Sequence, residues 1–268
     1  MAWFFSDIVT TPVHTISGED AQHIIKSLRM KIGEELSICD GSKIQYDCVI
    51  ENIGSGTVDI KILDSYPCKN EPHTKVTLYQ ALAKGDKMDF IIQKSVELGV
   101  SEIVPILTAR CVSRPDEKSM KKKTERWNKI ALQAAMQSRR GIIPTVKPMM
   151  KLTAAAKQAG STAVVCYELG GKPLGELVES RKSELSLFIG SEGGFERSEV
   201  EEILNLGGSA ATLGNRILRA ETAPLAALSV IMYLTGNLGN ENTEVRTDNG
   251  EEIKGGNWFN SECVMRNA

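Results

Sequence analysis

A glycine-dense turn stands in the second half of the chain, in the run Ile189-Gly190-Ser191-Glu192-Gly193-Gly194-Phe195. Glycines permit positive φ angles and a close approach of the backbone to a ligand, and free N–H groups at a helix start favour electron-rich atoms. The segment therefore predicts either a ligand-binding turn or only a tight connection between a strand and a helix. A dinucleotide site is not indicated, because GxGxxG is not matched and no acidic residue closes a following strand.

A second segment, from Leu213 to Ala223, concentrates charge between a predicted strand and a predicted helix. It contains Arg216, Arg219 and Glu221. Charged groups at such a position are costly to desolvate unless they are paired or used in chemistry. Two interpretations stay open: an Arg–Glu pair that braces the next helix, or a site that stabilises negative charge.

A third segment, Gln137-Ser138-Arg139-Arg140, ends a long amphipathic stretch. Arginines in a last helical turn complement the helix dipole, and taken alone this explanation is sufficient. Many cations precede it, with few acids among them. This basic cluster predicts a phosphate-binding surface or simply a solvated helix face; its main members are Arg110, Arg114, Lys118, Lys121, Lys122, Lys123, Arg126 and Lys129.

Strands and helices alternate around these segments. The alternation predicts a parallel α/β sheet that binds ligands at the carboxyl ends of its strands. Asp86 and Thr222 are expected to cap helices with their side chains, and Gly99 to end one. The expected strands are Lys75–Ala81, Ser101–Leu107, Thr162–Cys166, Leu185–Ile189 and Ala210–Leu213, and the expected helices include Lys151–Ala159 and Ser198–Asn205.

The N-terminal part shows a different pattern. A helix capped by Ser17 and Asp20 interrupts short strands, which together predict a small β-barrel. The run from Tyr66 to Pro72 has the composition of a linker. We therefore expect domains at residues 1–70 and 73–238, followed by a mobile polar tail, 239–268, in which six acids against three bases give 3 − 6 = −3. The expected barrel strands are Trp3–Phe5, Glu35–Cys39, Lys43–Ile50 and Thr57–Leu63.

The composition limits the class of protein. The chain has 268 residues and a formal net charge of −2, which argues against wholesale coating of nucleic acid but not against local basic patches. No apolar run approaches the ~18 residues of a membrane span, and the N-terminus lacks a leader pattern, so a cytoplasmic protein is expected. The six cysteines show no CxxC or Cys/His pairing, which predicts neither a metal site nor disulfides.

Taken together, the three segments resemble the ribosomal RNA small subunit methyltransferase E family of the knotted SPOUT methyltransferases. Further matches are Lys94 with Glu97-Leu98-Gly99, and, in the barrel, His23, Leu28-Arg29, Gly33 and Asp40-Gly41. The resemblance runs from residue 1 to about 238. Two positions depart from it: Ser191 stands where the family usually has proline, and Trp3 where a basic residue is expected.

The resemblance implies an α/β fold, with a C-terminal deep trefoil-knot (SPOUT) parallel-sheet domain and an N-terminal PUA-like small β-barrel. It implies a homodimer that uses S-adenosyl-L-methionine, without a metal, to methylate N3 of one uridine in 16S rRNA of the small ribosomal subunit. The implied catalytic residues are Arg139, Arg219 and Glu221. The implied cofactor residues are Leu169, Gly170, Ile189, Gly190, Glu192, Gly193, Gly194, Leu213, Gly214, Arg216, Ile217 and Leu218. The implied RNA contacts are Arg29, Arg110, Arg114, Lys121, Lys122, Lys123 and Arg140.

Two other classes of protein remain open at this point. A non-catalytic RNA-binding module would keep the barrel and the basic cluster, but it would not need the glycine turn or the charged segment. A nucleotide-dependent oxidoreductase would need a dinucleotide fingerprint, which the sequence does not show. Binding of S-adenosylmethionine, compared with NAD, separates these classes.

Overall fold

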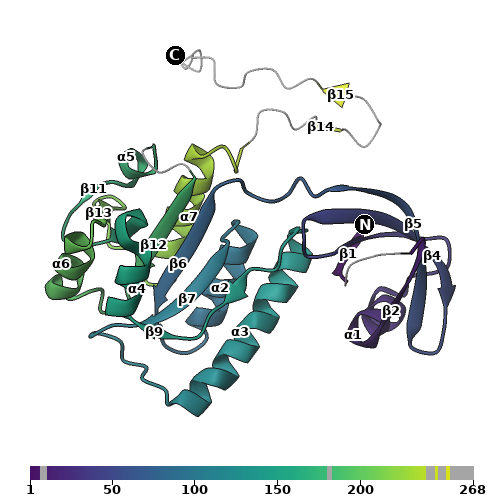
Figure 1. Ribbon diagram of the computed structural model, residues 1–268, viewed down its shortest axis with the longest axis horizontal. Coiled ribbons are helices and arrows are strands. Elements are labelled where there is room, and N and C mark those ends of the chain that lie inside the picture. Colours follow the sequence, from purple (N-terminus) through teal and green to yellow (C-terminus); the bar gives the residue numbers. More distant parts are fainter. Residues whose placement is uncertain (7–10, 180–182, 240–244, 247–251, 254–268) are drawn as a thin grey trace, which may run out of the picture.

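The computed structural model describes residues 1–6, 11–179, 183–239, 245–246 and 252–253. The described chain forms two main sheets, one near the N-terminus and one in the larger C-terminal part (Figure 1). The first sheet uses residues up to Pro67, and the second begins at Lys75. Most of the tail that begins at residue 239, with Trp258, Phe259 and Cys263, lies outside the described residues.

The N-terminal sheet has five strands in the spatial order β1-β3-β4-β5-β2. Only the β1–β3 pair is parallel among these strands. Buried side chains from the whole sheet, including Phe4, Leu36 and Ile60, form one apolar cluster. Ile24, from the helical segment between β2 and β3, packs into the same cluster. The strands are β1 (Ala2–Phe5), β2 (Val13–Ser17), β3 (Glu35–Cys39), β4 (Ile44–Ile53) and β5 (Thr57–Pro67).

Strand β2 was not predicted. Only Ile16 of this strand is buried, so its sequence lacks the alternation that marks a half-buried strand. The strand exists because it pairs with β5 along its whole length. Strand β5 also extends further than expected, to Pro67, and takes up the first part of the predicted linker.

The helix after β2 differs from the expected one. It consists of α1 (Gly18–Gln22) and a π-helical turn (His23–Leu28). Ser17 is the N-cap residue, but its side chain makes no capping hydrogen bond, so the expected Ser17–Asp20 cap is wrong. The π-helical turn ends at Arg29, whose left-handed φ of 53° turns the chain towards β3 and leaves this arginine exposed.

The C-terminal sheet is parallel in every described pair, in the order β11-β13-β10-β12-β6-β7-β8, with β9 also paired to β7. The long predicted strands are found to within one residue at each end. The short strands β8, β9 and β11 were not predicted. The strands are β6 (Lys75–Ala81), β7 (Glu102–Leu107), β8 (Thr145–Val146), β9 (Met150–Lys151), β10 (Ala163–Cys166), β11 (Lys172–Pro173), β12 (Glu184–Ile189) and β13 (Ser209–Thr212).

Helices cover the sheet and pack against one another in two groups (Figure 1). Helix α2 contacts α3 and α7, α7 also contacts α5, and α4 contacts α6. In the centre of the sheet the rings of Tyr79 and Phe188 stack at 4.4 Å. The helices are α2 (Lys87–Glu97), α3 (Glu117–Gln137), α4 (Leu152–Ala159), α5 (Leu174–Glu179), α6 (Arg197–Asn205) and α7 (Ala223–Leu234), with a short 3-10 turn at Gly160–Thr162.

The ends of these helices show which local signals were correct. Gly99 follows α2 with a φ of +95°, as its predicted role as a stop requires. Asp86 and Thr222 are N-cap residues, but neither side chain makes a capping hydrogen bond, so the two expected side-chain caps are wrong. A side-chain cap does begin α3, where Asp116 accepts a hydrogen bond from the Ser119 amide at 2.7 Å.

The remaining described elements are β14 (Val245–Arg246) and β15 (Glu252–Ile253), which pair with each other. No helix among the described residues is long and apolar enough to cross a membrane. In the same part of the chain, no group of three or more His, Cys, Asp or Glu side chains is arranged to hold a metal ion.

Candidate functional site

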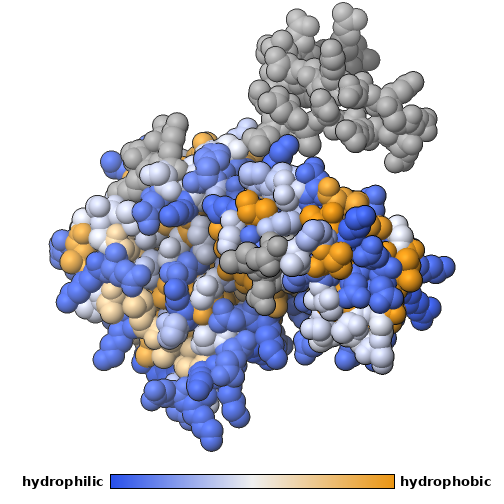
Figure 2. Space-filling view, turned by 45° about the vertical axis from the view of Figure 1, so that its right-hand side comes forward, coloured by the Kyte–Doolittle hydropathy of each residue, from blue (hydrophilic) through white to orange (hydrophobic). Residues whose placement is uncertain are grey.

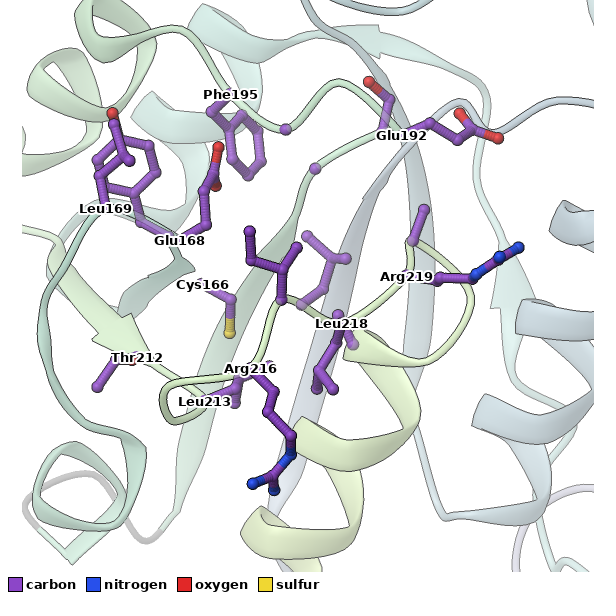
Figure 3. Close-up of a pocket in the computed structure, with 18 of the residues that line it drawn as sticks. Cys166, Glu168, Leu169, Glu192, Phe195, Thr212, Leu213, Arg216, Leu218 and Arg219 are labelled. Atoms are coloured by element: carbon purple, nitrogen blue, oxygen red, sulfur yellow. The ribbon is translucent and has the colours of Figure 1, made fainter.

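A pocket of about 820 Å³ opens at the carboxyl ends of the parallel strands. Three loops form most of its wall: residues 166–170 after β10, residues 189–195 after β12 and residues 212–220 after β13. Figure 3 places Glu168 and Leu169 on one side of this pocket and Arg219 on the other. The sheet therefore brings together segments that lie far apart in the sequence, at the edge where parallel sheets bind ligands.

All of the predicted cofactor residues line this pocket, and Arg219 lines it as well. Their role in binding stays a prediction, because the geometry shows only that they share one wall. Sequence reasoning missed several lining residues, of which Lys87 and Glu168 carry charge. Glu168 had a usable signal, since it comes two residues after the end of a buried strand.

The glycine turn needs two of its glycines for separate reasons. Gly194 has a φ of +68°, and a Cβ there would lie 2.5 Å from Glu168 Oε1. A Cβ on Gly190 would lie 2.9 Å from the Cα of Gly194, so the two arms of the turn approach closely. The Gly194 amide donates to the Ser191 carbonyl at 2.9 Å and closes the turn. The turn is therefore a tight backbone structure with room for a ligand beside it.

The neighbouring loop anchors the glycine turn. Arg110 Nη1 donates to the Gly193 carbonyl at 3.0 Å, and the Ser191 hydroxyl donates to the Arg110 carbonyl at 3.3 Å. Arg114 donates to the Ala109 carbonyl at 2.8 Å and so fixes the loop that carries Arg110. Serine in place of the family's proline at 191 thus supplies an extra tether. Both arginines are exposed and remain proposed RNA contacts as well.

The first prediction concerns this turn. Gly194→Val is expected to abolish S-adenosylmethionine binding, because a β-branched residue is strained at a φ of +68° and its Cβ would displace Glu168. Titration calorimetry measures the binding. The matched control is Gly41→Val in the barrel, where φ is +72° and nothing lies within 4 Å of the new Cβ. Unchanged binding in the Gly194 variant would contradict the pocket assignment.

Lys87 links the two charged loops at the mouth of the pocket. Its ammonium lies 3.1 Å from Glu221 Oε2 and 3.2 Å from Glu192 Oε1, and the Lys84 amide also donates to Glu192 at 3.0 Å. The contact with Glu221 Oε2 is a charge contact rather than a well-aligned hydrogen bond. Glu221 and then Glu192 raise the pKa of Lys87 above its ordinary value, so this lysine stays charged.

The same contacts bear on the two glutamates. Burial of Glu192 opposes ionisation, but the Lys84 amide and Lys87 outweigh it and lower its pKa. The backbone amide of Glu221 and then Lys87 lower the pKa of that carboxyl as well. A carboxylate with a lowered pKa is a weaker proton acceptor, which argues against Glu221 as a general base. Its structural role is to hold Lys87.

Arg219 is an exposed cation on the pocket wall. The ion pair of Glu221 is made with Lys87, and no Arg219–Glu221 ion pair forms among the described residues. The bracing interpretation of this arginine is therefore not supported. The Cys166 thiol also lines the pocket, and burial raises its pKa to about 12, so it stays protonated and is a poor nucleophile.

Arg139 does not line the pocket of its own chain. It follows α3 with a left-handed φ of 54°, is exposed, and donates from Nη2 to the Met1 carbonyl at 3.4 Å. The Asn70 side chain donates to the Arg139 carbonyl at 2.9 Å. The residue thus sits where the end of α3 meets β1 of the barrel (Figure 1).

Arg140 is buried, so its predicted contact with RNA is wrong. Only 4% of its side chain is exposed, and it forms a two-point ion pair with Glu71 at 2.8 and 2.9 Å. Its remaining Nη1 group donates to the carbonyls of Val96 and Val100. The guanidinium therefore ties α2, α3 and the linker together and has no free side for a phosphate.

The lysines of the basic cluster lie on the exposed side of α3, whereas Arg110 and Arg114 precede this helix. Lys121, Lys122 and Lys123 are all exposed, whereas Trp127 on the same helix is buried. Figure 2 shows hydrophilic residues over the projection at the lower end of the molecule, where Figure 1 places the start of α3. Arg126 forms ion pairs with Asp89 and Asp86, so its charge is partly neutralised within the protein.

Comparison with known families defines the class of protein. A family model described as "RNA methyltransferase domain" matches residues 69–232, and one described as "RNA methyltransferase PUA domain" matches residues 16–63. The second match covers most of the five-stranded sheet, and the first covers the parallel sheet with its pocket. The fold and the site are those of an RNA methyltransferase.

Full-length relatives give the family. The ribosomal RNA small subunit methyltransferase E of Bacillus subtilis is 36% identical over 85% of this chain and 93% of its own length. Two solved structures with bound S-adenosyl methionine are similar: a putative methyltransferase from Legionella pneumophila and the small subunit methyltransferase E from Neisseria gonorrhoeae. They have TM-scores of 0.77 and 0.79 at 30% and 29% identity, over 87% of this chain and 97% and 98% of theirs.

The chain belongs to the ribosomal RNA small subunit methyltransferase E family. The predicted fold class is confirmed: a trefoil-knot (SPOUT) parallel-sheet domain follows a PUA-like barrel. The oxidoreductase and non-catalytic alternatives do not fit this membership.

Proposed function

We propose that this protein transfers a methyl group from S-adenosylmethionine to N3 of one uridine in 16S rRNA of the small ribosomal subunit, in the cytoplasm. One observation carries the proposal. The glycine turn and the arginine-bearing loop, which lie apart in the sequence, surround a single pocket. That pocket belongs to a chain related to small subunit methyltransferases over most of its length.

The pocket residues fit the cofactor. Its volume, about 820 Å³, lies in the usual range for small-molecule sites. Leu169 and Ile217 on its wall are 77% and 86% exposed as residues, and a flat adenine ring would cover apolar surface of this kind. Glycine at 190 lets the two arms of the turn pack closely, and glycine at 194 leaves room for the Glu168 side chain beside the turn. When bound, S-adenosylmethionine supplies an electrophilic methyl group on a sulfonium.

The protein's part in the reaction is to stabilise the negative charge that develops on the base. Uracil N3 is a weak acid: it loses its proton to solvent water and takes the methyl group from the sulfonium, S-adenosylhomocysteine leaves, and along this path negative charge spreads to O2 and O4. Guanidinium groups aimed at these oxygens stabilise the charge better as it develops. Arg219 is exposed at the pocket and is not held by Glu221, so its donors are available. We assign it the role of a catalytic residue.

A second arginine is proposed to come from another copy of the chain. Arg139 lies at the junction of α3 and β1, outside its own pocket. A homodimer would also cover apolar side chains that stay exposed on and after α7, namely Val230, Tyr233, Leu234 and Leu238. A target base inside folded RNA would have to be turned out to reach both arginines.

RNA affinity is proposed to be mainly electrostatic and shared between Arg29 of the barrel and the basic cluster. Changing Lys121, Lys122 and Lys123 together to alanine is expected to weaken binding and to flatten its salt dependence by about 0.7–0.9 per lost phosphate contact. Filter binding across a salt series measures this slope. Lys75, Lys151 and Lys157 are also exposed and provide a control triple variant. A slope equal to that of the wild type would identify the cluster as a solvated helix face.

The direct test of the function uses the purified full chain with methyl-labelled S-adenosylmethionine. Free 16S rRNA and whole small subunits are offered as substrates, and nuclease digestion with mass spectrometry locates the methyl group. A label on uridine N3 supports the proposal. A label on another atom would keep the methyltransferase and overturn the target, and cofactor binding with no transfer to either substrate would favour another RNA.

A further inference from the structure

Glu168 is an acidic residue of the pocket wall whose carboxylate has no hydrogen-bond or ion-pair partner among the described residues. The other acid on the wall, Glu192, holds Lys87 and the Lys84 amide. Glu168 is exposed, lines the pocket, and takes part in no hydrogen bond or ion pair within the described residues. A carboxylate only accepts hydrogen bonds, so its two oxygens await donors from a ligand or from solvent.

The glycine turn is shaped around this carboxylate. A Cβ on Gly194 would lie 2.5 Å from Oε1, 3.1 Å from Cδ and 3.2 Å from Oε2 of Glu168. The carboxylate therefore lies directly against the α-carbon of Gly194, in space that any other residue type would fill. Figure 3 shows the Glu168 side chain rising beside Phe195, which follows this glycine, and not turning away from the pocket. The Glu168 carboxylate thus lies between the first loop and the glycine turn.

The surroundings indicate which part of the cofactor it meets. Leu169 follows directly and is the exposed apolar side chain on this side of the pocket, suited to an adenine ring. The ribose is bonded directly to the adenine, so it must lie next to the contact between the adenine and Leu169. Its 2′ and 3′ hydroxyls offer two neighbouring donors, which match two carboxylate oxygens. An acidic side chain that binds ribose hydroxyls at a strand end is also how other nucleotide-binding sheets recognise this sugar.

We propose that the Glu168 carboxylate accepts hydrogen bonds from the ribose hydroxyls of S-adenosylmethionine and thereby selects ribonucleoside cofactors. The inference rests on the proposed use of this pocket for the cofactor. It assigns a specificity-determining residue, and it gives Gly194 a second reason to be glycine. It requires no change in the protein, because the carboxylate is already free and held beside the turn.

Titration calorimetry on the full chain tests the proposal without any turnover. Glu168→Ala is expected to bind S-adenosylmethionine about 10- to 100-fold more weakly, the scale of hydrogen bonds to a charged group. It should bind 5′-methylthioadenosine, which keeps the ribose but lacks the amino acid part, more weakly by the same factor. A 2′,3′-dideoxy form of that compound should bind the variant and the wild type equally. Glu176→Ala, at an exposed acid of α5 outside the pocket, serves as the control.

Each other result overturns a defined statement. If the variant weakens S-adenosylmethionine but not 5′-methylthioadenosine, Glu168 meets the amino acid part and the ribose assignment is wrong. If neither ligand is affected, the carboxylate faces solvent in the complex and the inference fails, while the cofactor pocket stands. If the wild type itself binds none of these adenosine compounds, the proposed function fails instead. Glu168 has no partner within the described chain, so its removal should leave the melting temperature unchanged.

Discussion

Arg219→Ala is expected to lower turnover by about 10²–10³-fold while the affinity for S-adenosylmethionine stays close to that of the wild type. An arginine that touches the oxygens of the base binds the neutral base modestly and the anion-like transition state strongly. Its removal therefore reduces kcat more than it raises KM. The structure supports this reading, because Arg219 lies exposed on the pocket wall while Glu221 is paired with Lys87.

The control for this prediction is Arg197→Ala. Arg197 is an exposed arginine of α6 whose ion pair with Glu201 lies on the surface, and its replacement should leave turnover unchanged. Single-turnover kinetics and thermal unfolding are measured on both variants. A loss of melting temperature with unchanged kcat for Arg219→Ala would show that this arginine braces α7 and does no chemistry.

Mixed dimers extend the same experiment to Arg139. If the partner supplies Arg139, a dimer of one Arg139→Ala chain and one Arg219→Ala chain contains one complete site and one that lacks both arginines. Co-purification with two affinity tags isolates this species, and it should recover about half of the wild-type turnover. A mixed dimer as inactive as either parent would place both arginines in separate roles or in the same chain.

The features that the sequence predicted are those coded by neighbouring residues. Strands β6 and β12 show as apolar runs because both faces of a parallel sheet are buried. The glycine turn follows β12 directly, so the sequence predicts its position at the end of a strand. Strand β2 escaped detection because it buries a single side chain, Ile16, and depends on its partner β5. Such a strand has almost no pattern of its own.

The features that could not be predicted depend on partners far along the chain. Lys87 looks like an ordinary residue in the first turn of a helix, and its two glutamates come from loops that only the folded sheet brings near. Arg140 stands beside Arg139 in a basic segment, where a phosphate contact was a reasonable expectation. Its actual partner, Glu71, lies in a linker that carries no periodic signal. Residue type predicts the chemistry that a side chain can do, but not the partner it does it with.

That buried pair gives the second large prediction. Arg140→Ala is expected to lower the free energy of unfolding by about 3–5 kcal/mol, because it leaves a buried carboxylate without its cation. Glu71 is 6% exposed at its side chain, and besides Arg140 it accepts hydrogen bonds from the amides of Gly141 and Ile142. Lys147→Ala provides the comparison, since the Lys147–Glu102 pair is partly exposed and should contribute only about 0–1 kcal/mol.

A double variant separates the effect of the two charges from the effect of the volume that the side chains fill. Glu71→Gln with Arg140→Met removes both charges and keeps most of the volume, so it should be less destabilised than Arg140→Ala alone. Urea unfolding of the single and double variants measures the difference. Glu71 holds the turn after α3, which carries Arg139, through Arg140 and two backbone amides. Arg140→Ala should therefore also lose turnover. An Arg140→Ala protein as stable as the Lys147→Ala protein would mean that the guanidinium does not tie the linker to α3.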